Sequence, residues 1–217
     1  MANLNPMLKL LRLASSQFDF THANTLYKQQ GVSDLNKVPY IGRQISHFEA
    51  VEIDKITAAF SEDRRYRYRL SLTYRPEANR TKNAAIILKN PSSADINRAD
   101  KTVQTAAKTI YMAFPEVKKL EILNIFAIRG TLPTDVMELH DAGIDIIGPE
   151  NDTNFKEVLE NSDYVITAWG GATPIKKSIY DKRVADVLAI LNLPEVEAKV
   201  LRKAEKGSNQ YPFHACY

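Results

Sequence analysis

Three short, almost wholly apolar runs, each followed by polar residues, constrain the fold more than any other feature of this sequence. They lie at residues 84–88, 120–128 and 164–168. Runs of this length are typical of strands that are buried on both faces of a parallel sheet. Segments with apolar residues at helical spacing follow them, at 103–114, 149–161 and 180–191. Because strands alternate with helices, we predict an α/β fold with a mostly parallel central sheet in a three-layer α/β/α arrangement.

The remaining segments add detail to this prediction. Residues 66–74 alternate with a period of two, which predicts an antiparallel edge strand or a hairpin arm. A short helix is expected from Thr134 toward His140, and residues 196–201 are a candidate fourth strand. Residues 1–50 are polar and weakly periodic. We therefore expect an N-terminal extension at 1–50 and an α/β domain at 51–217.

Composition narrows the class of protein. With 217 residues, 44% of them hydrophobic and 25% charged, the chain suits one folded domain. The one cysteine, Cys216, cannot form an internal disulfide, and the apolar residues near the start are too interrupted for a signal or membrane segment. We expect a cytoplasmic protein that does not enter a membrane. A net charge of +3 permits a polyanionic partner without requiring one, and the oligomeric state is left open.

Candidate functional residues follow from the ends of the predicted strands, where ligands bind in open α/β sheets. Asn90 before Pro91 either starts a turn, as Asn-Pro commonly does, or contacts a ligand. Asn124, an amide inside an apolar strand, is either a satisfied core amide or a group that reads a planar ligand edge. Phe126 and Trp169 are core side chains unless they stack on a base.

Other signals are ambiguous or missing. The arginines interleaved with tyrosines at 64–75 are read first as an ordinary strand with a solvated face and second as a nucleic-acid surface. The chain has no phosphate-binding G-x-x-x-x-G-K-[ST] loop, no G-x-G-x-x-G, no G-x-S-x-G and no metal-ligand spacing of His and Cys. Accordingly, no cofactor and no metal are expected.

Five ordered motifs resemble an uncharacterised bacterial and phage family, domain of unknown function 1643. They are YRYRL at 66–70, NPSSAD at 90–95, NIFAIR at 124–129, GPEND at 148–152 and AWG at 168–170. The likeness runs from about residue 57 to the end of the chain. The family label supplies no activity.

A more distant likeness is to the uracil-DNA glycosylase superfamily, which implies that superfamily's fold. Its water-positioning Asn-Pro is similar to Asn90-Pro91, and its base-reading asparagine is similar to Asn124. Its C-terminal His-Pro-Ser is replaced by Tyr211-Pro212-Phe213, so the histidine that stabilises the leaving base is absent, and Tyr211 or His214 would have to substitute.

This resemblance implies a role for each candidate residue. Asn90 holds the attacking water, Asp95 gives electrostatic or base assistance, and Asn124 bonds the extruded base. The other base-binding candidates are Phe126, Trp169, Gly170 and Tyr211. The DNA-binding candidates are Arg67, Arg69, Ser92, Ser93, Arg129, Lys176 and Lys177.

The sequence thus predicts a DNA glycosylase, a hydrolase of base excision. It would cleave the N-glycosidic bond of a flipped, modified pyrimidine, with a role in phage defence. Three alternatives stay open. The first is a pocket enzyme or binding protein for a free nucleotide or nucleoside, and the second is a non-catalytic nucleic-acid binding module. The third is an interaction protein with a degenerate pocket, which the missing histidine favours.

Overall fold

The computed structural model describes residues 45–130, 133–172, 174–197 and 199–201. Most of the expected N-terminal extension and the candidate Tyr211 therefore lie outside the described residues, as do His214 and Cys216. The part of the extension that is described joins the domain, because Ile45 forms an antiparallel bridge with Ala99.

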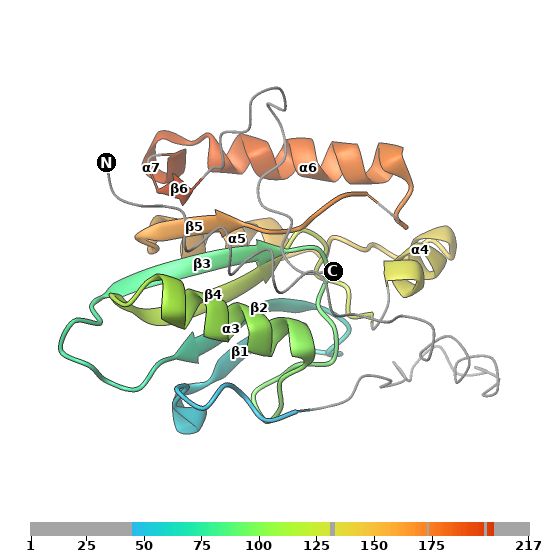
Figure 1. The fold of residues 1–217 in the computed structure, drawn as a ribbon. Coiled ribbons are helices and arrows are strands. Elements are labelled where there is room, and N and C mark those ends of the chain that lie inside the picture. Colours follow the sequence, from blue (N-terminus) through green and yellow to red (C-terminus); the bar gives the residue numbers. More distant parts are fainter. Residues whose placement is uncertain (1–44, 131–132, 173, 198, 202–217) are drawn as a thin grey trace.

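A mixed six-stranded sheet forms the centre of the molecule, in the order β1-β2-β4-β3-β5-β6 (Figure 1). Its strands are β1 (Thr57–Phe60), β2 (Arg67–Thr73), β3 (Lys82–Leu88), β4 (Val117–Asn124), β5 (Tyr164–Thr167) and β6 (Val200–Leu201). The pairs β1/β2 and β2/β4 are antiparallel, whereas β4/β3, β3/β5 and β5/β6 are parallel. The three apolar runs of the sequence become β3, β4 and β5, as predicted.

For residues 66–74 one of the two expected alternatives is confirmed, and the expectation for the last strand needs correction. β2 is a hairpin arm, because β1 precedes it in the chain and pairs antiparallel along its outer side, and for the same reason β2 is not the edge strand. Four residues of β1 carry too little alternation to be recognised in the sequence. The predicted strand at 196–201 shortens to β6, because α7 (Pro194–Glu197) occupies the first part of that segment.

Helices lie against both faces of the sheet (Figure 1). They are α3 (Lys101–Ala113), α4 (Pro133–Asp141), α5 (Asn151–Glu160) and α6 (Lys177–Leu191), with a short 3-10 turn η1 (Ile53–Lys55) before β1. Asp100 caps α3 by accepting a hydrogen bond from the Val103 amide at 2.8 Å, and Pro115 stands just beyond its end. The predicted helices at 103–114, 149–161 and 180–191 are confirmed as α3, α5 and α6.

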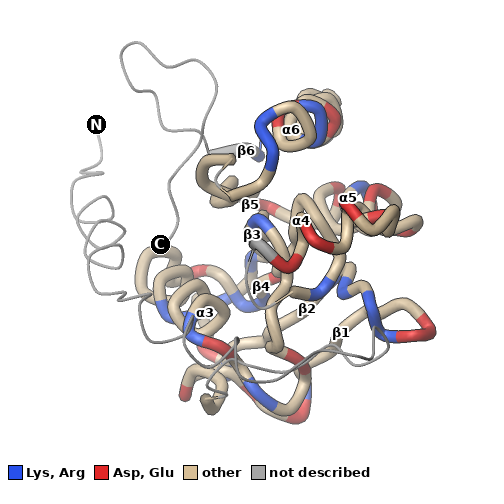
Figure 2. Tube along the Cα trace, turned by 90° about the vertical axis from the view of Figure 1, so that its right-hand side faces the viewer, with Lys and Arg blue, Asp and Glu red and all other residues tan. Residues whose placement is uncertain are grey.

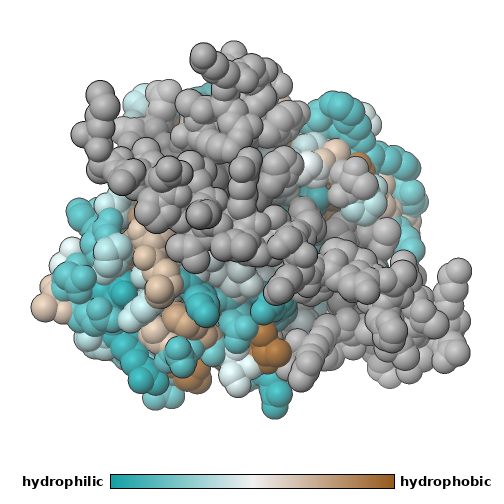
Figure 3. All heavy atoms as spheres, in the orientation of Figure 1, coloured by the Kyte–Doolittle hydropathy of each residue, from teal (hydrophilic) through white to brown (hydrophobic). Residues whose placement is uncertain are grey.

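The two faces of the sheet have separate cores, because side chains alternate along each strand. On one face, Ile86 and Ile122 pack with α3 residues such as Ala107. On the other, Ile87 and Leu123 pack with side chains of α5 and α6. On the face of the molecule in Figure 3, hydrophilic and hydrophobic residues are intermixed over the described surface.

No helix of the described residues is long and apolar enough to cross a membrane.

Candidate functional site

The central strand β3 pairs parallel with β4 on one side and with β5 on the other. All three strands therefore end at one edge of the sheet, which we call the carboxyl edge. Leu88 is the register partner of Asn124, and Ile87 is the partner of Thr167. The antiparallel strand β2 begins there, at Arg67. Topology therefore gathers a strand start and three strand-end loops at one place, which Figure 2 faces.

The loop after β3 carries Asn90 alongside the continuation of β4. The backbone amide of Ile125 donates to Leu88 O at 2.9 Å, and that of Phe126 donates to Lys89 O at 2.9 Å. The half-buried Asn90 side chain donates through Nδ2 to Gly130 O at 3.0 Å. Asn90 and Asn124 therefore lie on neighbouring segments, and the amide of Asn90 is held by the loop after β4.

Asp95 organises the turn that follows. Its Oδ1 accepts the backbone amides of Asn97 at 2.8 Å and Arg98 at 3.2 Å, which closes the loop before α3. Its backbone oxygen accepts a hydrogen bond from His47 Nε2 at 2.9 Å. Burial lowers the pKa of His47, although Asp95 and Asp100 oppose that effect. The carboxylate of Asp95 therefore has a structural task as well as its predicted catalytic one.

The two serines of the loop have different surroundings. Ser92 donates its hydroxyl to Asp100, the residue that caps α3. Ser93 is 8% exposed, and its hydroxyl has no hydrogen-bond partner among the described residues. Ser92 thus fixes the N-terminal cap of α3, whereas the Ser93 hydroxyl could bond to a ligand.

Asn124 is buried, with 1% of its surface exposed, and its side chain is held by Arg67. Arg67 Nη2 donates to Asn124 Oδ1 at 3.2 Å, and Arg67 Nη1 donates to Ala94 O at 2.7 Å. The amide nitrogen Nδ2 of Asn124 has no partner among the described residues. The oxygen of this amide is therefore paired with Arg67, whereas its nitrogen is a donor that meets no acceptor among the described residues.

Arg67 itself is 2% exposed, so it does not lie on the surface where a phosphate contact was expected. Burial lowers the pKa of Arg67 to about 10, and Asp100 and Asp95 partly offset this. The guanidinium therefore stays charged at neutral pH and acts inside the protein.

Asn151 and Arg183 brace the end of β4 from the other face of the sheet. Asn151 Nδ2 donates to Asn124 O at 3.1 Å, and Arg183 Nε donates to Ile125 O at 2.6 Å. Arg183 Nη2 also donates to Asp152 Oδ1 at 2.6 Å. The GPEND segment is thus more than a helix start, because it locks α5 and α6 to the strand that carries Asn124. Sequence reasoning missed this role, although the motif itself was noticed.

The aromatic candidates Phe126 and Trp169 belong to the hydrophobic core. They are 0% and 1% exposed and pack in the same cluster as Ile87 and Phe155. This agrees with the first of the two readings that the sequence left open, and neither ring offers a face to a ligand in this structure. Gly170 has a φ of 67°, and its backbone oxygen accepts a hydrogen bond from the Tyr180 hydroxyl.

A basic group lies where the β1–β2 turn meets the loop after β4. Arg64 stacks over the Phe60 ring at 4.2 Å and Arg129 at 5.2 Å, both measured to the ring centroid. Burial and the neighbouring Arg64 lower the pKa of Arg129, while Asp95 raises it. Arg64 has a φ of 58°, which is unusual for a side chain of this size. Arg129 therefore lies beside the candidate site. Arg64, which the sequence marks only as part of the arginine-tyrosine stretch at 64–75, lies next to it.

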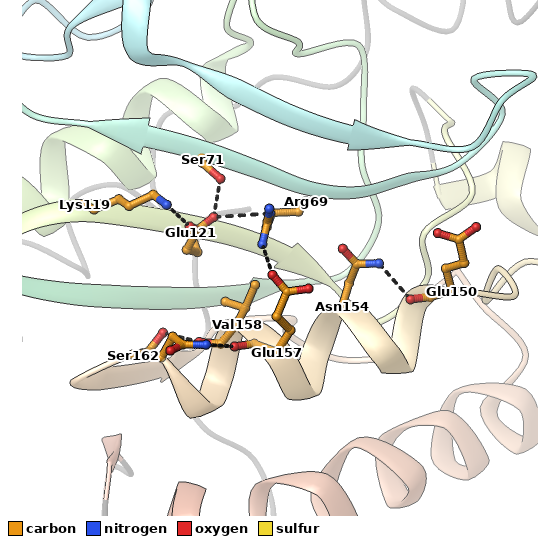
Figure 4. A network of polar contacts seen from close by, with 10 residues as sticks. Arg69, Ser71, Lys119, Glu121, Glu150, Asn154, Glu157, Val158 and Ser162 are labelled. Atoms are coloured by element: carbon orange, nitrogen blue, oxygen red, sulfur yellow. Dashed lines mark hydrogen bonds and ion pairs between the residues drawn. The ribbon is translucent and has the colours of Figure 1, made fainter.

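The other expected DNA contacts lie elsewhere. Arg69 belongs to a polar network on the sheet face that α5 covers, where its Nη1 donates to Glu157 Oε1 at 3.1 Å (Figure 4). Lys176 and Lys177 are exposed at the start of α6, and they pair with Asp141 and Asp181 respectively. The structure does not bring these three side chains into contact with Asn90 or Asn124.

Lys89 is a buried residue that sequence reasoning passed over. It is 4% exposed, directly precedes Asn90, and has its pKa lowered to about 8 by burial. A lysine at the end of an apolar run was the signal that could have identified it. Among the described residues, no group of His, Cys, Asp or Glu side chains is arranged to hold a metal ion.

Buried polar atoms without a partner among the described residues lie at this edge, and most of them are donors, although Asn151 Oδ1 is an acceptor. The buried atoms Arg67 Nε, Ser93 Oγ, Asn124 Nδ2, Arg129 Nε and Trp169 Nε1 have no hydrogen-bond partner among the described residues. Buried polar groups are normally paired, so a set of orphan donors indicates a place for acceptors. The arrangement suits a ligand with carbonyl oxygens, ring nitrogens or phosphate oxygens.

Comparison with protein families gives one match. Residues 67–214 match the model of a family described as protein of unknown function (DUF1643). No curated protein and no solved structure matches the chain.

Proposed function

Since the chain belongs to the DUF1643 family, whose description assigns no activity, we propose its function from the carboxyl edge: a DNA glycosylase that hydrolyses the N-glycosidic bond of a flipped pyrimidine. The proposed substrate is a modified pyrimidine in DNA, as in phage genomes, and the proposed place of action is the cytoplasm. We also propose that the fold is a three-layer variant of the uracil-DNA glycosylase arrangement. The parallel strands β4, β3, β5 and β6 and the helices on both faces support that relationship.

The amide of Asn124 is the observation that carries the proposal. Its Nδ2 is buried and has no partner among the described residues, which is unfavourable by about 1–3 kcal/mol unless an acceptor meets it. An extruded base supplies such acceptors on its Watson–Crick edge. Asn90 lies on the adjacent segment, in the loop after β3.

The proposed reaction divides the work among a few groups. Asn124 binds the base, Asn90 orients a water toward the anomeric carbon, and Asp95 supports the developing positive charge of the sugar. Asparagine is a weak base, so the water is positioned more than it is deprotonated, which suits a dissociative bond cleavage. The electron pair of the C–N bond leaves with the base, and once the water has added to the anomeric carbon its proton passes by way of the Asp95 carboxylate to the departed base. Arg129 and Arg64 would contact the phosphates beside the extruded nucleotide.

The decisive experiment incubates the full chain with plain DNA, uracil-containing DNA and phage DNAs with modified cytosines or thymines. Alkali then cleaves abasic sites, and mass spectrometry identifies any released base. We expect a freed base and alkali-labile strand breaks with at least one DNA. No freed base from the whole panel would overturn the proposal. Steeply salt-dependent binding without product would instead favour the binding module.

A further inference from the structure

Arg67 connects the two halves of the candidate site. It begins β2, and the antiparallel direction of that strand places it at the carboxyl edge between the loop after β3 and the end of β4. One guanidinium nitrogen donates to Ala94 O at 2.7 Å, in the loop that carries Asn90 and Asp95. Another donates to Asn124 Oδ1 at 3.2 Å. A single buried side chain therefore sets the distance between this loop and the amide of Asn124.

The chemistry of arginine also decides which way that amide faces. A guanidinium has five donors and no acceptor, so only the oxygen of the Asn124 amide can face it. The amide nitrogen is then directed away from Arg67, where it has no partner among the described residues. Turning the amide over would place two donors against each other and leave both unsatisfied.

The backbone at this point is fixed as well. Asn151 Nδ2 donates to Asn124 O at 3.1 Å and lies 3.4 Å from Ile125 O. The main chain and the side chain of Asn124 are thus held from opposite faces of the sheet, by Asn151 and Arg67. Such support is what a group that must meet its ligand in one orientation requires.

We propose that Arg67 is a positioning residue of the excision reaction, which holds the donor end of the Asn124 amide toward the base and keeps the Asn90 loop in register with it. This inference rests on the proposed glycosylase function. It implies that the base presents an acceptor to Asn124, either a carbonyl oxygen or an unprotonated ring nitrogen. Arg67 is 2% exposed and does not act as a phosphate contact.

A double-mutant cycle tests whether Arg67 acts through Asn124. The variants are Arg67→Met, Asn124→Ala and the two together, and the readout is the single-turnover rate of release of the base that the wild type frees. We expect each single change to lower the rate by about 100-fold and the double change to be within about 3-fold of Asn124→Ala alone. The affinity for DNA should stay within about 3-fold, since neither side chain meets a phosphate.

Two further variants separate positioning from loss of folding. Arg67→Lys keeps the charge and can reach one of the two oxygens, so we expect a loss of about 10-fold with a nearly unchanged melting temperature. Arg80→Met is the matched control. Arg80 is also a buried arginine, 8% exposed, and it donates to Val117 O at the other end of β4. Its loss should lower the melting temperature and leave the rate unchanged.

The outcomes distinguish this inference from the function on which it rests. Losses that multiply in the double variant, or a Kd for DNA that rises in parallel with the fall in rate, would overturn the positioning role while the glycosylase function stands. A wild type that frees no base from any DNA would overturn both.

Discussion

At the scale of single residues, the proposed function depends mainly on the side-chain amide of Asn124 and on the residues that contact it. Asn124 is the buried polar residue at the end of β4 that sequence reasoning singled out, and the structure shows that half of it is occupied by Arg67. Asn90 lies on the adjacent segment, with its Nδ2 bonded to Gly130 O. The two amides thus differ, since the Asn90 side chain is anchored to a loop while Nδ2 of Asn124 meets no acceptor in the described part of the chain.

Removal of the Asn90 amide tests its role as the water-positioning group. For Asn90→Ala we expect excision to fall by about 100-fold or more, with the Kd for DNA within about 3-fold, because in the proposed mechanism this amide contacts the water and not the DNA. The measurement is abasic-site formation beside an electrophoretic binding assay. Asn161→Ala at the end of α5 is the control. Undiminished excision in Asn90→Ala would remove this residue from the mechanism.

Lys89 gives a prediction about stability and pH. Burial lowers the pKa of Lys89 to about 8 in the folded protein, whereas an unfolded chain has the ordinary value of 10.5. The unfolded state therefore binds more protons between these values, so the contribution of Lys89 to the free energy of unfolding increases as the pH rises from about 8 to 10.5.

Urea denaturation at pH 7.5 and pH 10 measures this effect. Lys89 is only 4% exposed, so we expect a gain of about 2 kcal/mol in the wild type relative to Lys89→Met. The variant removes the titration, and other groups that titrate in this range contribute equally to both proteins. An identical pH dependence of wild type and variant would show that the Lys89 ammonium is solvated in the folded state.

At the scale of elements, the segment before α5 positions the end of β4. Gly148 has a φ of 91°, and a Cβ there would lie 2.9 Å from Tyr66 Cδ1 and 3.0 Å from Tyr68 Cε1. These two rings are stacked with centroids 6.1 Å apart, and the Tyr66 hydroxyl donates to Asp145 O at 2.7 Å. The glycine therefore allows α5 to approach the sheet, where Asn151 reaches the backbone of Asn124.

A pair of glycine substitutions isolates this close approach. Gly148→Ala should lower the free energy of unfolding by about 2–4 kcal/mol, because a positive φ and a steric overlap act together. Gly143→Ala is the control, since Gly143 has a φ of 82° but nothing within 4 Å of the added Cβ. We expect that variant to lose only about 1 kcal/mol. Chemical denaturation compares the two, and equal losses would mean that backbone conformation alone explains the effect.

At the scale of the whole molecule, charge is unevenly distributed although the net charge is only +3. Figure 2 shows a basic segment at the start of α6, and a basic segment next to an acidic one at the turn between β1 and β2. Around the turn, Arg64 and Arg129 share the Phe60 ring beside the carboxyl edge. Several other basic residues, such as Arg69, Lys82 and Lys176, are paired with carboxylates. The proposed DNA surface is therefore centred on Arg64 and Arg129.

The salt dependence of DNA binding tests this surface. Arg64→Gln and Arg129→Gln should each reduce the slope of log K against log salt by about one, because each removes one phosphate contact. Lys82→Gln is the control, since Lys82 pairs with Asp163 at 3.0 Å at the opposite end of β3. Fluorescence anisotropy over a range of salt concentrations gives the slopes. Equal slopes in all four proteins would place the DNA surface elsewhere.

The sequence by itself determined the class of fold and the candidate positions just after β3 and at the end of β4. Apolar runs and helical spacing are local patterns, so β3, β4, β5, α3, α5 and α6 could be predicted from neighbours along the chain. The position of Asn124 within such a run also marked it, because a buried amide needs partners.

Only the tertiary structure decided who those partners are. Arg67 is far from Asn124 in sequence, and it meets Asn124 only because β2 pairs antiparallel with β4 at the edge where the parallel strands end. The same guanidinium also reaches Ala94 O in the loop after β3. The burial of Arg67, Phe126 and Trp169 likewise depends on long-range packing, because it is set by the elements that cover the face of the sheet toward which each side chain points. Strand order and direction arise from long-range packing, which periodicity along the chain does not encode.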